Sequence, residues 1–98
     1  MPATVKMKPT TNRLTNYMEE LAGGILEDIL SGAKGVTFSE NDIEDIKALA
    51  LNRLWPMYTT SAAGKGFLKK MAVEDDVEKD IVRELKAAID IVRSNPRG

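Results

Sequence analysis

Three consecutive hydroxyl-bearing residues, Thr59, Thr60 and Ser61, stand at the expected start of a short helix, where an anion can bind. The first backbone N–H groups of a helix have no partner within the helix, and its dipole favours negative charge there. Arg53 lies upstream and Lys65 downstream, so cationic side chains can flank the same place. The pattern is therefore typical of a phosphate site. The simpler alternative is that one hydroxyl only caps the helix and the others are solvated.

Asn52 and Arg53 lie at the end of the preceding apolar helix, which Pro56 prevents from continuing. In that position Arg53 complements the negative end of the helix dipole, and Asn52 can satisfy the last carbonyl groups. Alternatively, the guanidinium stacks on a planar ring or binds phosphate through two hydrogen bonds. Trp55 and Tyr58 flank the proline and can either pack in a core or interface or stack on a base. The residues alone leave these alternatives open.

The composition disfavours several classes of function. The chain has no cysteine and no histidine, so it lacks thiolate chemistry, the usual general base and the commonest zinc ligand. We therefore expect no enzyme, no catalytic residue and no metal site. The acids of residues 40–45 are better explained by helix capping, because no calcium-loop spacing is present.

The charge and hydropathy patterns also limit the partners. A formal net charge of −1 gives no general attraction to nucleic acid, and acids interleave with the bases of the later helices. No apolar run is long enough for a membrane span, and residues 1–12 lack the apolar core of a signal peptide. We expect a cytoplasmic protein that binds neither membranes nor nucleic acid.

The elements that must position these residues are helices. Ninety-eight residues make one domain, which we place at residues 13–98 after a flexible arm at residues 1–12. Apolar periodicity predicts an all-α bundle of about four helices, and no segment has the alternation of a strand. The expected helices cover roughly residues 13–31, a segment from Ser39 to the residues before Pro56, about 61–71, and 75–94.

Each helix has its own local signals. In the second helix, Ser39 and Asp42 resemble a capping box. Gly23 and Gly24 interrupt the first helix, and we interpret them as a place where a neighbouring helix crosses closely. The expected buried residues of the first helix are Leu14, Tyr17, Met18, Leu21, Ile25, Ile29 and Leu30. Those of the last helix are Val77, Ile81, Leu85, Ala88 and Val92.

Three stretches resemble the ComFB family of late-competence proteins. The central one runs from Asp45 through Ala-Leu-Ala-Leu-Asn-Arg-Leu and Pro-x-Tyr to Thr60. Asn16-Tyr17-Met18-Glu19 resembles the family's N-terminal helix motif, and Ile91 to Pro96 resembles the end of its C-terminal helix. The resemblance implies a small helical protein that forms a symmetric homodimer. It covers nearly everything after residue 12.

The resemblance also bears on ligands. One branch of the family binds zinc through three cysteines, but the matching positions here are Thr37, Ser39 and Asp42, so we do not expect zinc. The cysteine-free branch is associated with cyclic di-GMP and with the regulation of competence or motility. The residues that the resemblance assigns to cyclic di-GMP are Lys47, Asn52, Arg53, Tyr58, Thr59, Thr60 and Lys65.

Within that set the resemblance implies different roles. Arg53 stacks on guanine or meets phosphate, Tyr58 packs on a base, the two threonine hydroxyls contact phosphate and Lys65 supplies charge. Trp55 departs from the family pattern, which usually has a proline there, and can alter the wall of the pocket. We therefore expect a non-enzymatic cyclic di-GMP receptor that relays the nucleotide level to an unknown downstream protein. The alternative is a homodimeric adaptor without a small ligand.

Overall fold

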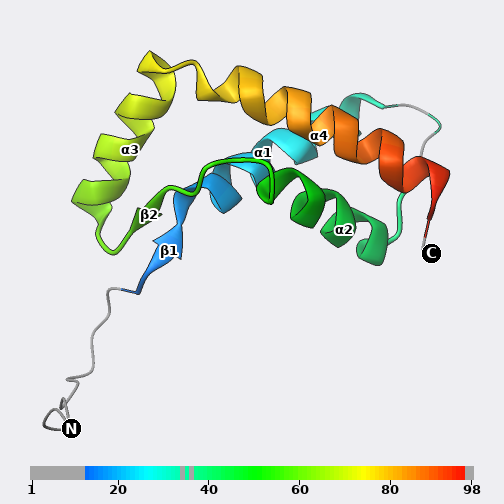
Figure 1. Cartoon of the computed structure of the whole chain (residues 1–98), viewed down its shortest axis with the longest axis horizontal. Helices are drawn as coiled ribbons and strands as arrows, with labels where there is room; N and C mark the ends of the chain where they lie inside the picture. Colours follow the sequence, from blue (N-terminus) through cyan, green and yellow to red (C-terminus); the bar gives the residue numbers. More distant parts are fainter. Residues whose placement is uncertain (1–12, 34, 36, 97–98) are drawn as a thin grey trace, which may run out of the picture.

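The computed structural model describes residues 13–33, 35 and 37–96, and the arm expected at residues 1–12 lies outside them. Within the described residues the chain folds as four helices and two very short strands (Figure 1). In chain order these are β1 (Thr15–Asn16), α1 (Tyr17–Gly32), α2 (Glu40–Leu51), β2 (Tyr58–Thr59), α3 (Ala62–Glu74) and α4 (Val77–Ser94). The predicted all-α class with about four helices is confirmed.

The core lies between α1, α2 and α4. Helices α2 and α4 lie side by side and run in opposite directions, and α1 packs against both (Figure 1). The buried apolar residues form one cluster, made of Met18, Ala22, Leu26, Ile46, Ala50, Ile81, Leu85, Ala88 and Val92. The spacing of the last four residues matches the stripe expected for the last helix, so this part of the prediction is confirmed.

The buried face of α1 differs from the predicted one. Leu14 is 68% exposed, because the helix begins only at Tyr17 and Leu14 precedes it. Met18, Ala22 and Leu26 are the buried residues that recur every four positions. Tyr17 of the predicted stripe is also buried, whereas Leu21, Ile25, Ile29 and Leu30 flank this row and are partly buried. The helical spacing of the apolar residues was therefore predicted correctly, but the centre of the buried face of α1 lies about one position from the predicted one.

The absence of strands was a wrong prediction. Thr15–Asn16 and Tyr58–Thr59 pair in antiparallel fashion, with Thr15 opposite Thr59 and Asn16 opposite Tyr58. Each strand has only two residues, which is too short to show an alternating pattern in the sequence. Their pairing fixes the segment that follows α2 against the start of α1.

Two local predictions have different outcomes. The Ser39 hydroxyl accepts a hydrogen bond from the Asp42 N–H at 3.0 Å, which confirms the predicted helix cap. The close helix crossing at Gly23 and Gly24 is wrong, because a Cβ at either position would meet nothing within 4 Å. These glycines therefore weaken the helix without making room for a neighbour among the described residues.

Helix α3 is the least embedded element. None of its described residues is buried, and it stands apart from α2 on the far side of the molecule (Figure 1). It ends at Glu74, later than predicted, and α4 begins only at Val77, so Asp75 and Asp76, which were expected in the last helix, form the turn between α3 and α4. In that turn Asp76 adopts a left-handed backbone conformation with φ of 54°.

None of the helices in the described part of the chain has the length and apolar character needed to cross a membrane.

Candidate anion-binding site

Asn16 organises the part of the molecule that carries the candidate site. Its side-chain Oδ1 accepts hydrogen bonds from the N–H of Met18 at 3.2 Å and from the N–H of Met57 at 2.7 Å. The first bond caps α1, and the second reaches 41 residues along the chain. The Tyr17 N–H returns a hydrogen bond to the Met57 carbonyl at 2.6 Å. Asn16 thus joins the start of α1 to the segment that leads into β2.

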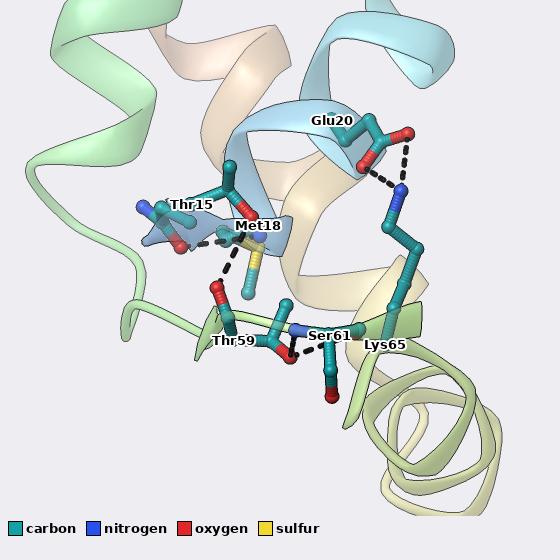
Figure 2. Close-up of polar contacts among 7 residues, drawn as sticks. Thr15, Met18, Glu20, Thr59, Ser61 and Lys65 are labelled. Carbon is teal, nitrogen blue, oxygen red and sulfur yellow. Dashed lines mark hydrogen bonds and ion pairs between the residues drawn. The ribbon is translucent and has the colours of Figure 1, made fainter. Parts of the chain in front are cut away.

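This role of Asn16 was missed in the sequence, although a signal existed. An asparagine immediately before an apolar helical pattern is a preferred N-cap, and it would have placed the helix start at Tyr17. The hydrogen bond from the Met57 N–H to Asn16 could not be predicted from the sequence, because the two residues are 41 positions apart. The Thr15 hydroxyl adds a further link by donating to the Thr59 carbonyl at 3.3 Å (Figure 2).

The N-terminus of α3 follows directly from β2 and has a dense local hydrogen-bond pattern. The Ser61 hydroxyl caps the helix by accepting from the Gly64 N–H at 3.0 Å. The Thr59 hydroxyl donates to the Ser61 carbonyl at 3.2 Å and accepts from the Ser61 N–H at 3.4 Å (Figure 2). Gly64 is needed for this arrangement, because a Cβ there would overlap the Thr59 hydroxyl oxygen.

Two backbone donors remain at this helix start. The N–H groups of Ala62 and Ala63 occupy the first two helical positions, which have no acceptor within the helix. The Ser61 hydroxyl binds the next N–H, that of Gly64. The two alanine N–H groups are therefore available to an anion at the positive end of the dipole. The Thr59 hydroxyl, by contrast, is already used by the backbone of Ser61.

Lys65 lies in the first turns of α3 and reaches back to α1. Its Nζ is 3.0 Å and 3.2 Å from the two carboxylate oxygens of Glu20 (Figure 2). The same Nζ lies 5.8 Å from the centre of the Tyr17 ring, at the outer limit of a cation–π contact. The side chains of Lys65 and Glu20 are 44% and 60% exposed. Solvent therefore reaches the pair, and a ligand can reach it too.

An open hollow of about 390 Å³ lies at this helix start. It is lined by Arg13, Thr15, Thr59, Thr60, Ser61, Ala62 and Lys65. Three of the residues predicted for the ligand, Thr59, Thr60 and Lys65, are thus brought together. Arg13 and Thr15 complete the wall and were missed, because nothing local relates them to α3. We call this the α3 hollow.

Lys47 and Tyr58 lie in a neighbouring hollow of about 640 Å³, which shares Thr15 with the α3 hollow. Tyr58 is 60% exposed there. Lys47 is engaged by Glu44, one turn earlier on α2, with its Nζ 3.1 Å from the carboxylate. These two predicted residues therefore lie beside the α3 hollow and not in it.

Asn52 and Arg53 do not line the α3 hollow. Asn52 is exposed and ends α2, with its N–H donating to the Ala48 carbonyl at 3.1 Å. Arg53 is exposed and lines a separate hollow of about 200 Å³ together with Trp55 and Arg83. Trp55 is 87% exposed, forms part of that wall and does not line the α3 hollow.

The fold and this geometry define a class of protein: a small all-α domain with a solvent-open, anion-compatible hollow. Among the described residues, no group of three acidic, cysteine or histidine side chains is placed to hold a metal ion. The absence of zinc stays a prediction.

A family model described as late competence development protein ComFB matches residues 15–96, so the chain belongs to the ComFB family. The resemblance seen in the sequence is thereby confirmed at family level.

A solved structure supports the same fold. The chain is similar to the structure titled "Structural characterization of the late competence protein ComFB from Bacillus subtilis", with a TM-score of 0.75 and 20% sequence identity. The match covers 86% of this chain and 92% of that one. At this identity the likeness speaks for the fold alone. No curated protein sequence matches the chain significantly.

Proposed function

We propose that this chain is a non-enzymatic receptor for cyclic di-GMP. The observation that carries the proposal is the α3 hollow, whose wall contains two cationic side chains, Arg13 and Lys65, together with Ala62, the first residue of α3. Backbone donors and cations together are the groups that recognise phosphate. The volume of about 390 Å³ lies within the range of about 300–1,000 Å³ that is usual for small-molecule sites.

The neighbouring hollow suggests where the base lies. The exposed ring of Tyr58 borders it, and aromatic faces stack on nucleobases. With a phosphate at the start of α3, one guanine can extend past Thr15 towards Tyr58. The proposed contacts are therefore Arg13, Thr60, Lys65 and Tyr58. Asn52 and Arg53 stay outside them, because neither lines either hollow. Lys47 lines the hollow of Tyr58 and is held by Glu44 as Lys65 is held by Glu20, so it flanks the proposed base.

The receptor would act in the cytoplasm and pass the nucleotide level to a protein partner in competence or motility control. A ligand changes partner binding only when it binds one arrangement of the protein better than another. Helix α3 is the element best placed to respond, since it borders the hollow and none of its residues is buried.

Isothermal titration with cyclic di-GMP tests the proposal. Replacing Lys65 by Gln removes one charge-assisted contact, so the affinity should fall about tenfold or more, as expected from about 1.5–3 kcal/mol for such a contact. The matched control is Lys86→Gln, which makes the same change at an exposed position of α4. Absence of binding by the wild-type chain would refute the proposal, and equal losses in both variants would remove Lys65 from the site.

A specific observation favours a second function, that of a homodimeric adaptor without a small ligand. Phe67 and Val73 on α3 are 64% and 78% exposed. A groove of about 400 Å³ with a mainly apolar wall, including Leu21 and Ile25, lies between α1, α3 and α4. Exposed apolar surface of this kind is typical of protein interfaces.

The homodimer that the family resemblance implies has its own test. If the groove is the dimer surface, Val73→Asp should convert a dimer into a monomer in light scattering coupled to gel filtration. Ala87→Asp places the same charge at an exposed position of α4 and should leave the mass unchanged. A monomeric wild-type chain at high concentration would refute the dimer.

A further inference from the structure

Lys65 of the α3 hollow already holds a carboxylate of the same chain. Both oxygens of Glu20 lie within 3.2 Å of its Nζ, across 45 residues of sequence (Figure 2). Glu20 belongs to the first turn of α1, where the helix dipole favours a carboxylate. Its position is fixed by the Asn16 cap one turn earlier. The carboxylate is therefore presented to Lys65 by a rigid element and not by a loop.

We propose that Glu20 sets the affinity and the selectivity of the α3 hollow by competing with the incoming phosphate for Lys65. This inference rests on the function proposed above. A phosphate that reaches Lys65 must displace the Glu20 carboxylate or accept its repulsion at close range. Because both side chains are about half exposed, the competition is weak enough for a ligand to overcome.

The competition depends on how densely the ligand carries its charge. Each phosphate of a cyclic dinucleotide is a diester with a single negative charge, held apart from the other. Pyrophosphate and the terminal groups of nucleoside triphosphates concentrate several charges on adjacent phosphorus atoms. Repulsion by one nearby carboxylate grows with the charge that faces it. Glu20 therefore disfavours polyphosphates more strongly than phosphodiesters, and selects for the cyclic dinucleotide.

The test is a titration of two probes, cyclic di-GMP and inorganic pyrophosphate, into the full chain and its Glu20→Gln variant. The matched control is Glu27→Gln, which makes the same charge change two turns further along α1. Glu20→Gln should bind cyclic di-GMP about two- to fivefold more tightly, the range expected when one exposed charge pair is removed. The gain for pyrophosphate should be larger, and Glu27→Gln should change neither affinity.

The possible results separate this inference from the proposed function. Cyclic di-GMP bound equally by wild type and Glu20→Gln would overturn the role of Glu20 and leave the receptor standing. If no chain binds cyclic di-GMP but Glu20→Gln gains affinity for pyrophosphate, the receptor proposal fails and the role of Glu20 stands. No binding of either probe to any chain would overturn both. Equal gains in Glu20→Gln and Glu27→Gln would mean a general charge effect and would also overturn the role of Glu20.

A second variant pair shows whether the effect passes through Lys65. In a Lys65→Gln background the gain from Glu20→Gln should shrink, because the cation for which Glu20 competes is missing. An undiminished gain would refute the competition. Both side chains are exposed, so neither replacement threatens the fold.

Discussion

The replacement Asn16→Ala tests the physical reasoning on the site most directly. It removes the acceptor that both Met18 and Met57 use, at a residue that is not one of the four proposed ligand contacts, although it lies beside Tyr58. Loss of a helix cap costs about 0.5–2 kcal/mol. Leaving the partly buried Met57 N–H without a partner costs about 1–3 kcal/mol more. The free energy of unfolding should therefore fall by about 1.5–5 kcal/mol, a large fraction of the total stability of a small domain.

The assay is urea denaturation followed by far-UV circular dichroism. The fluorescence of Trp55 is less suitable because this residue is exposed in the folded chain. All variants are compared at one protein concentration, since a dimer would make stability depend on concentration. Asn16→Asp is the control. It keeps the acceptor and adds a charge that suits the helix dipole, so it should stay within about 0.5 kcal/mol of wild type.

We also expect Asn16→Ala and Asn16→Asp to differ in their affinity for cyclic di-GMP. The wall of the α3 hollow contains Thr15 and Thr59, which the β1–β2 pairing holds together. Asn16→Ala should weaken cyclic di-GMP binding even where the protein is still folded, whereas Asn16→Asp should not. A loss of stability below about 1 kcal/mol in Asn16→Ala, or an equal loss in Asn16→Asp, would refute the assigned role of the Asn16 side chain.

Two further predictions concern packing. Leu85→Ala should lower the free energy of unfolding by about 2–5 kcal/mol because Leu85 is fully buried. Leu14→Ala should change it by less than about 0.5 kcal/mol, since Leu14 is exposed, and similar losses in the two would contradict the core described above. Gly64→Ala should displace the Thr59 hydroxyl and weaken cyclic di-GMP binding, because the added Cβ has no room. Gly66→Ala has open space in the same helix and should instead stabilise the chain by about 0.5–1 kcal/mol in thermal denaturation, with unchanged binding. Equal effects of the two glycine replacements on binding would count against the close approach at Gly64.

The sequence alone predicted the features that depend on neighbouring residues. The apolar row of α4 repeats every three or four positions, so its buried face followed from helical geometry before any contact was known. The cap at Ser39 depends on a spacing of three residues, and it was found for the same reason. Family membership was also visible, since its motifs lie within continuous stretches.

The tertiary structure decided what depends on distant residues. Asn16 binds Met57 across 41 positions, and Lys65 binds Glu20 across 45, and neither pairing leaves a periodic trace in the chain. The candidate site shows the consequence. Arg53 and Lys65 were expected to flank one place, but the chain turns at residues 52–54 before it reaches β2, and the two side chains line different hollows. Arg13 joins Lys65 because β1 pairs with β2, and only the folded chain brings these charges together.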